Sequence, residues 1–447
     1  MKYHHDTIAA LATAQGMGGI AVIRISGEEA KGALEKCFRT SQILTSHRLC
    51  YGHVLDSTGA VIDETMAVFM RAPHTYTRED VCEIHCHGGS IQVRRILERL
   101  FELGVKPAQP GEFTKRAFMN GRLSLSQAEA VMALIGSSSQ AQARSAMRQI
   151  QGSVSRAIDK MAVELARLIS LIEAGNDFPE EIDEQATESE LIASIDQIIH
   201  QLTVICDPKR ARIVRDGFHV AIVGRPNTGK SSLLNALCEE QRAIVSQQAG
   251  TTRDVLRENI EIKGIPITLN DTAGQRDTDD EVEKIGVTRA RQIEQSADLV
   301  LMVLEASDAI SAEEIKTLKN ADERYVVIVN KTDLAQVLDL SGFENLEKIH
   351  ISAMTGAGID ALKNMIAKKA GDGLSNNDQM TVRRHVDAAL DAITSLQMAK
   401  KTIEKGFSHD VCAIDLSLAL EKLMLINGQS ATETVISQIF SNFCVGK

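Results

Sequence analysis

Residues 224–231, GRPNTGKS, have the types and spacing of a loop that binds phosphate. The apolar run FHVAIV precedes them and a stretch with helical periodicity follows, which is the setting that such a loop requires. The backbone N–H groups of the loop and the helix N-terminus together attract anions. We expect Lys230 to neutralise the charge of the β- and γ-phosphates and the hydroxyl of Ser231 to bind Mg²⁺. The segment therefore predicts a nucleoside triphosphate as ligand.

Four further motifs follow in the order that guanine-nucleotide switches require. They are AGTTRD at 249–254, DTAG at 271–274, NKTD at 330–333 and ISA at 351–353. Thr252 is the expected switch threonine, which closes on Mg²⁺ only while the γ-phosphate is present. Asp271 ends the run ITLND, where we expect it to hold Mg²⁺ through water, and the N–H of Gly274 is expected to meet the γ-phosphate.

The choice of base follows from the last two motifs. The carboxylate of Asp333 can accept hydrogen bonds from both N1–H and N2–H₂ of guanine, a pair of donors that adenine does not offer. We expect Asn330 to brace the loop and the aliphatic stem of Lys331 to pack on the base. The N–H of Ala353 is expected to donate to guanine O6. The predicted nucleotide is GTP, not ATP.

The full predicted site contains these residues and their neighbours in the motifs. Its GTP-binding residues are Asn227, Thr228, Gly229, Lys230, Ser231, Ser232, Ser246, Gln247, Gln248, Ala249, Gly250, Thr251, Thr252, Asp271, Thr272, Ala273, Gly274, Asn330, Lys331, Thr332, Asp333, Ser352, Ala353 and Met354. Gln275 follows DTAG directly, where Ras-like switches have the glutamine that orients the attacking water, although a surface glutamine is an equal alternative. The acidic run at 277–286 offers another candidate, a base that acts through a water.

The periodicity of the chain changes along its length and predicts its domains. Residues 1–119 mix β-like runs such as GGIAVIRIS with helical stretches, which indicates an α+β module. Residues 120–213 have the helical period, and residues 375–447 return to it. Between them, residues 214–374 alternate strands and helices, which predicts a Ras-like P-loop domain with a mostly parallel sheet. We therefore expect a GTPase domain inserted into a discontinuous helical domain, behind a separate N-terminal module.

Within the helical segment, one helical face is predicted from apolar residues at spacings of three and four. These residues are Val154, Ile158, Met161, Leu165, Ile169 and Ile172.

The composition limits the partners and the compartment. The 49 basic and 60 acidic residues give a net charge of −11, whereas a sequence-blind nucleic-acid binder is usually basic. We expect no DNA partner, and any RNA contact must use local basic patches. Eight scattered cysteines indicate a reduced, cytoplasmic protein. No apolar run approaches 18 residues, so no membrane span is expected.

The segment VCEIHCH, at 81–87, crowds cysteines and histidines together as a zinc site does. In an extended strand, however, Cys82 and Cys86 face one side, while His85 and His87 face the other. Because these side chains cannot all reach one metal ion, we do not expect zinc here.

Blocks outside the GTPase motifs carry a resemblance that runs from end to end. They are DTIAAL and GGIAVIRISG near the start, CHGG at 86–89, PGEFTKRAFMNGR at 110–122, QAEAV at 127–131, DFPEE at 177–181 and FCVGK at 443–447. With the GTPase motifs, they make the chain similar to the MnmE (TrmE) family of tRNA modification GTPases, within the TrmE-Era-EngA-YihA-Septin-like class. The GTPase motifs alone fit many GTPases, whereas the N-terminal blocks and the terminal CVGK are specific to this family.

The resemblance implies a chemistry and a set of partners. It implies a carboxymethylaminomethyl- or aminomethyl-type addition at C5 of the wobble uridine of certain tRNAs. The flavoprotein MnmG (GidA), which carries the FAD, would share the work in a heterotetramer-like complex. A 5-formyl- or methylene-tetrahydrofolate, bound by the N-terminal module, would supply one carbon. Family members form homodimers through that module, and their G domains meet in a K⁺-dependent way.

The resemblance also implies roles for residues at matching positions. The folate would be contacted by Arg24, Glu83, Arg122 and Lys447. The K⁺ ion would be surrounded by Asn227, Ser246, Gln248 and Thr251. Glu283 would position the hydrolytic water. Cys444 is the candidate covalent or acid–base residue, and a cysteine that packs as a small hydrophobe is the alternative.

The chain departs from the family pattern at three places. Gln275 stands where the family usually has an apolar residue, so both Gln275 and Glu283 remain candidates for orienting the water. Ser124 replaces the usual Asp of the NGR-x-D-L segment, and ATAQGMGG replaces ATPPGRGG near the expected folate region.

The main rival interpretation is a regulatory GTPase switch in ribosome assembly, in which hydrolysis only times release from RNA. Such a switch usually appends a compact basic RNA-binding module, whereas the segments that flank the GTPase motifs here are acidic and helical. A dynamin-like assembly GTPase would need a far longer helical stalk and a membrane-binding element.

Overall fold

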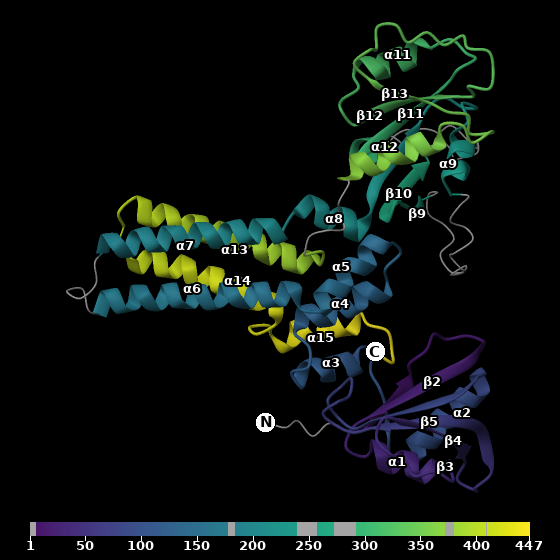
Figure 1. The fold of residues 1–447 in the computed structure, drawn as a ribbon, viewed down its shortest axis with the longest axis vertical. Helices are drawn as coiled ribbons and strands as arrows, with labels where there is room; N and C mark the ends of the chain where they lie inside the picture. Colours follow the sequence, from purple (N-terminus) through teal and green to yellow (C-terminus); the bar gives the residue numbers. More distant parts are fainter. Residues whose placement is uncertain (1–5, 178–183, 239–256, 272–291, 372–379, 408) are drawn as a thin grey trace, which may run out of the picture. The chain divides into compact units, whose positions relative to one another are not determined.

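The computed structural model describes residues 6–177, 184–238, 257–271, 292–371, 380–407 and 409–447. The chain divides into two compact units. The first contains residues 1–132, 149–200 and 387–447, and the second contains residues 133–148 and 201–386. Figure 1 labels most of their helices and strands.

The first unit begins with a seven-stranded sheet. In spatial order its strands are β3 (Phe38–Arg39), β4 (Arg48–Leu55), β5 (Val61–Met70), β6 (Val81–Gly88), β2 (Gly18–Ser26), β1 (Ile8–Leu11) and β7 (Lys106–Pro107). Neighbouring strands are antiparallel except β1 and β7, which are parallel. Helices α1 (Ala30–Cys37) and α2 (Ser90–Glu102) contribute to the same apolar core as the sheet. This is the α+β module that the sequence predicts.

One face of this sheet is apolar because side chains alternate along each strand. Cys82, Ile84 and Cys86 are buried in the core, whereas Glu83 and His85 are only partly buried. The predicted alternation along the strand is confirmed. Among the described residues, no group of three or more His, Cys, Asp or Glu could hold a metal ion.

The rest of the first unit is helical. Its helices are α3 (Glu112–Met119), α4 (Leu125–Ile135), α6 (Ser153–Asp177), α7 (Glu184–Ile205), α13 (Arg383–Glu404), α14 (His409–Asn427) and α15 (Glu433–Ser441), of which α4, α7 and α13 extend past the boundary of the unit. Helices α6 and α14 pack along each other (Figure 1). The predicted apolar face of α6 is confirmed except at one position, where Leu168 is buried and Ile169 is only partly buried. None of the described helices is long and apolar enough to cross a membrane.

The second unit contains a six-stranded sheet. In spatial order its strands are β13 (Glu347–His350), β12 (Tyr325–Asn330), β11 (Leu299–Glu305), β8 (Phe218–Val223), β10 (Ile265–Asp271) and β9 (Arg257–Ile262). All neighbours are parallel except β9 and β10. The described helices of this unit include α5 (Gln140–Ile150), α8 (Pro208–Asp216), α9 (Lys230–Cys238), α11 (Ala312–Lys319) and α12 (Ile359–Gly371). A mostly parallel sheet with helices is the Ras-like architecture predicted for an inserted G domain.

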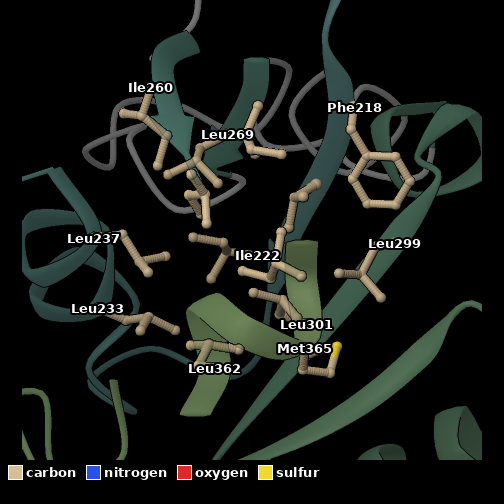
Figure 2. Close-up of a cluster of buried hydrophobic side chains, with 14 of the residues drawn as sticks. Phe218, Ile222, Leu233, Leu237, Ile260, Leu269, Leu299, Leu301, Leu362 and Met365 are labelled. Carbon is tan, nitrogen blue, oxygen red and sulfur yellow. The ribbon is translucent and has the colours of Figure 1, made fainter. Parts of the chain in front are cut away.

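Aliphatic side chains from the sheet and from α9 and α12 form the main core of this unit. Figure 2 shows Ile222 and Leu301 from the sheet facing Leu233 from α9 and Leu362 from α12. All four are fully buried, and burial of each such side chain stabilises the fold by about 1.5–3 kcal/mol. This core fixes the ends of β8, β11 and β12, from which the loops of the nucleotide site emerge.

Candidate functional site

The loop between β8 and α9 turns sharply where its backbone has positive φ. Gly224, Asn227 and Gly229 have φ of 148°, 65° and 92°. A Cβ on Gly224 would clash with the carbonyl oxygen of Val303, and one on Gly229 would clash with the side-chain amide of Asn330. Only glycine fits these two positions, which explains two of the glycines in GRPNTGKS. The strand–loop–helix setting that a phosphate-binding loop needs is present.

Lys230 and Thr228 hold this loop in shape. The ammonium of Lys230 donates to the carbonyl oxygens of Gly224 at 2.8 Å and Arg225 at 2.6 Å. The hydroxyl of Thr228 donates to the carbonyl oxygen of Arg225 at 2.9 Å. Lys230 is only 6% exposed although it is charged, so its ammonium lies inside the loop where phosphates are expected. Ser231 and Ser232 follow in the first turn of α9.

Asn330 joins the phosphate loop to the loop expected to bind the base. Its side-chain amide donates to the carbonyl oxygen of Thr228 at 2.9 Å, and its Oδ1 accepts the N–H of Ala353 at 3.1 Å. The side chain is 1% exposed. Its expected bracing role therefore extends to three segments of the site. The N–H of Ala353, expected to donate to O6 of guanine, is bonded within the protein in this structure.

Asp333 is oriented by the segment after β13. The hydroxyl of Ser352 donates to Asp333 Oδ1 at 2.5 Å and accepts the N–H of Thr355 at 3.2 Å. Asp333 itself is exposed, so its carboxylate can accept hydrogen bonds from a ligand. The neighbouring members of the predicted set lie beside it: Thr332 donates its N–H to Ile351, and Met354 is 90% exposed.

Two ion pairs flank the site, and the sequence motifs do not include their acidic partners. Lys331 Nζ lies 2.6 Å from Glu305 Oε2, and the other oxygen of Glu305 accepts the hydroxyl of Ser307 at 2.7 Å. These two bonds hold the pKa of Glu305 below its usual range. Arg225 lies 2.6 Å from Asp308, and this hydrogen bond lowers the pKa of Asp308.

Several predicted residues of the nucleotide site are not described. Asp271 is the last residue of β10 and pairs with Ile222 of β8, which places its backbone next to the strand that enters the phosphate loop. Outside the described residues lie Ser246, Gln247, Gln248, Ala249, Gly250, Thr251, Thr252, Thr272, Ala273, Gly274, Gln275 and Glu283. Of the residues implied for K⁺, only Asn227 is described.

A second cluster lies in the N-terminal module and contains three of the residues implied for folate. Arg24 and Glu83 are opposite each other on β2 and β6, and Arg24 Nη2 lies 2.8 Å from Glu83 Oε1. The guanidinium of Arg24 lies 5.3 Å from the centre of the Tyr76 ring, and that of Arg122 lies 4.8 Å from the same centre. Cationic groups at this distance from a ring are attracted to it. The structure thus brings Arg24, Glu83 and Arg122 together around Tyr76.

The C-terminal tail docks against the same module. The N–H of Gly111 donates to the carbonyl oxygen of Cys444 at 3.4 Å, and the N–H of Phe113 donates to that of Lys447 at 3.2 Å. Gly446 is buried, and a Cβ there would clash with the carbonyl oxygen of Leu11 on β1. The tail is therefore held at α3 and β1, and Cys444 is exposed, whereas the other seven cysteines are buried.

Two aromatic residues of the N-terminal cluster were missed from the sequence. The guanidinium of Arg24 lies 5.8 Å from the ring centre of Phe113, and the hydroxyl of Tyr76 is 2.9 Å from that of Thr114. Phe113 lies in the block PGEFTKRAFMNGR, so that block contained a signal for it. The only sequence signal for Tyr76 was the rarity of aromatic residues, because the residues that surround it in space are distant in sequence.

Comparisons with known proteins show which family the chain belongs to. Two family models match the chain, the MnmE helical domain over residues 125–444 and the GTP-binding protein TrmE N-terminus over residues 7–122. Among curated relatives, the tRNA modification GTPase MnmE of Natranaerobius thermophilus is 41% identical over 455 residues, which is 99% of each chain. That of Bacillus mycoides is also 41% identical over 455 residues and 99% of each chain.

Solved structures resemble only part of the chain. The G domain of the T. maritima FeoB iron transporter is 27% identical and covers 34% of this chain and 98% of its own, with a TM-score of 0.26. Aquifex aeolicus Era bound to GDP and aluminium fluoride is 26% identical over 40% of this chain and 67% of its own, with a TM-score of 0.27.

The first model covers more than half of the chain, and the curated relatives match almost all of it. The resemblance found in the sequence is confirmed, and this chain, a GTPase, belongs to the MnmE (TrmE) family of tRNA modification GTPases.

Proposed function

We propose that this chain couples GTP hydrolysis to an aminomethyl- or carboxymethylaminomethyl-type addition at C5 of the wobble uridine of tRNA. The observation that carries the proposal is that the N-terminal cluster and the C-terminal tail meet at Phe113. Its ring contacts Arg24, and its N–H is bonded to Lys447, the end of the tail that bears Cys444. A cluster suited to an anionic aromatic ligand therefore shares Phe113 with the backbone of a tail that bears an exposed thiol.

In the G domain, the proposal assigns guanine recognition to Asp333. Its exposed carboxylate is oriented by Ser352, and Asn330 ties its loop to the phosphate loop. Ser231 and Thr252 are proposed as Mg²⁺ ligands, with Asp271 acting through water. The ion would neutralise charge that develops on the phosphates during hydrolysis.

In the N-terminal module, the proposal assigns a tetrahydrofolate to the cluster around Tyr76. A folate needs a carboxylate for the N–H donors of its pterin and cations for its glutamate tail, and Glu83, Arg24, Arg122 and Lys447 are of these types. The aromatic face of Tyr76 suits a flat ring system. The folate would supply one carbon, and these residues would bind and orient it.

We further propose that the chain forms homodimers through its N-terminal sheet. Ile20, Leu49, Tyr51 and Met66 are 40–69% exposed on β2, β4 and β5. Tyr51 lies opposite Met66, so at least these two side chains share a face. Large apolar side chains gathered on a surface mark an interaction site. The K⁺-dependent meeting of G domains, with Asn227, Ser246, Gln248 and Thr251 around the ion, remains a proposal from the family.

The proposed partners are tRNA and the FAD-carrying flavoprotein MnmG, and the proposed compartment is the cytoplasm. The test is mass spectrometry of tRNA nucleosides from cells that lack this protein, complemented with the wild-type chain or with Cys444→Ser. We expect a C5-substituted wobble uridine to be lost in the deletion and restored by the wild type only. Restoration by both chains would assign Cys444 to structure. An unchanged nucleoside profile in the deletion would reject the modification and favour the assembly switch.

A further inference from the structure

One short segment, residues 305–308, holds both basic side chains that flank the nucleotide site. Glu305 binds Lys331, the lysine of NKTD, and Asp308 binds Arg225, the second residue of GRPNTGKS. Both ion pairs lie within the second unit. Neither acid belongs to a motif that identifies a GTPase, so the sequence did not point to them.

Glu305 is a rigid anchor, not a mobile surface carboxylate. It is the last residue of β11, and its Cα lies opposite that of Asn330 on β12. One carboxylate oxygen accepts from Lys331 and the other from Ser307, so the group cannot rotate without losing a bond. The side chains of Lys331 and Glu305 are 32% and 22% exposed, which limits screening of the pair by solvent.

Asp308 is anchored by the start of α11. The hydroxyl of Ser311 accepts the N–H of Glu314, and Glu314 returns a bond to the N–H of Ser311, which together form a capping box. Glu314 is 5% exposed, and its carboxylate lies 3.6 Å from Arg225. The segment that bears Asp308 therefore ends in a fixed helix terminus, and Arg225 is attracted by two acids.

Lys331 is the residue whose position this anchor decides. It follows β12 directly and has a left-handed backbone, with φ of 64°. A lysine side chain has large rotational freedom, and fixing that freedom on binding costs affinity. With its ammonium held by Glu305, the aliphatic stem of Lys331 is restrained at both ends before the ligand arrives.

We propose that Glu305 is a positioning residue for guanine nucleotides, which holds the stem of Lys331 in place to pack on the base, and that Asp308 holds the phosphate loop through Arg225. Glu305 does not touch the ligand. It raises the affinity for every purine nucleotide whose base packs on Lys331, whereas Asp333 determines which purine is preferred.

The test measures the affinity and dissociation rate of GDP with the full chain for Glu305→Ala and Lys331→Ala, singly and together. Glu313→Ala is the matched control, because Glu313 is an exposed acid on α11. We expect Glu305→Ala to weaken GDP binding about 3- to 10-fold, as the loss of a partly buried ion pair predicts. The double variant should bind GDP no more weakly than Lys331→Ala alone, because both changes remove the same interaction.

Further readouts separate positioning from a structural effect. The ratio of GDP to IDP affinity should stay unchanged in Glu305→Ala, and kcat at saturating GTP should match the wild type. Glu305→Gln, which keeps the shape, should lie between the wild type and Glu305→Ala. Asp308→Asn should also weaken GDP binding, but additively with Lys331→Ala, since it acts through Arg225.

Unchanged GDP affinity in Glu305→Ala would overturn the proposal. Affinity losses from Glu305→Ala and Lys331→Ala that add in the double variant would overturn it too. So would a fall in the thermal stability of Glu305→Ala that explains its lost affinity and is absent from the Glu313→Ala control.

Discussion

The side-chain amide of Asn330 and the carbonyl oxygen of Thr228 are joined by a 2.9 Å hydrogen bond that ties the base-recognition loop to the phosphate loop. Asn330 is nearly fully buried, so neither of its polar groups can turn to water instead. The phosphate loop and the base-recognition loop are therefore held in a fixed arrangement by the side chain of Asn330.

Removing this hydrogen bond should lower both the stability of the G domain and its affinity for nucleotide. Asn330→Ala leaves the carbonyl of Thr228 and the N–H of Ala353 without their partner, at a cost of about 1–3 kcal/mol for each buried group that stays unpaired. Thermal unfolding with and without GDP measures both effects. Asn364→Ala, at an exposed position on α12, is the control. A variant as stable and as tightly bound to GDP as the control would contradict the role of Asn330.

Asp333→Asn should change the preferred base. The amide of asparagine has one acceptor and one donor where the carboxylate has two acceptors. It therefore cannot accept hydrogen bonds from both N–H groups of guanine, whereas its donor can pair with the added oxygen of xanthine. We expect preference to move from GTP toward xanthosine triphosphate, measured as the ratio of the two dissociation constants. An unchanged preference for GTP would reject Asp333 as the residue that reads the base.

Two substitutions decide which side chain orients the attacking water. If Glu283 has this role, Glu283→Ala should lower kcat for GTP hydrolysis by about 10²- to 10⁴-fold, while Gln275→Ala has little effect. Single-turnover hydrolysis at saturating K⁺ separates this loss from nucleotide binding. The reverse pattern would assign the water to Gln275, which stands at the position used by Ras-like switches.

Cys444 should be the cysteine whose thiol is alkylated in the folded protein. Burial raises the pKa of the thiols of Cys37, Cys86 and Cys412 to about 11, and only the thiolate reacts. Iodoacetamide at pH 8 should therefore add one group per native chain, located by peptide mass spectrometry. Cys444→Ser should remain unlabelled over the same time. Rapid labelling of a second cysteine would contradict the burial seen here.

The imidazole of His87 should stabilise the N-terminal module in its charged form. Its Nδ1 lies 2.7 Å from Asp63 Oδ1, and this hydrogen bond raises the pKa of His87 above its usual 6.5. The contribution is fully present below pH 6.5 and is lost as pH rises through the raised pKa. Denaturant unfolding of the wild type and His87→Gln should therefore differ most at acid pH and converge at alkaline pH. His200→Gln serves as the control, and a difference that grows with pH would contradict this sign.

Much of the G domain could be predicted because its chemistry lies in contiguous segments. Each loop of a few residues contains the groups it needs: a glycine for a turn and a lysine for phosphate in GRPNTGKS, and an acid for guanine in NKTD. Both motifs can therefore be recognised without knowledge of the fold. Strands such as β2 and β6 were equally legible, since alternation along a strand is a local property. The resemblance to the family added identity, which no periodicity contains.

Tertiary structure decided everything that depends on register and on contacts between distant segments. Arg24 meets Glu83 because β2 and β6 pair with those residues opposite each other, and a slip of one residue would turn one of the two to the other face. Glu305 reaches Lys331 because β11 and β12 are parallel neighbours. Cys444 lies beside Gly111 only because the tail folds back onto α3. Sequence spacing determines which groups a loop offers, whereas the packing of whole elements determines which groups from different loops meet.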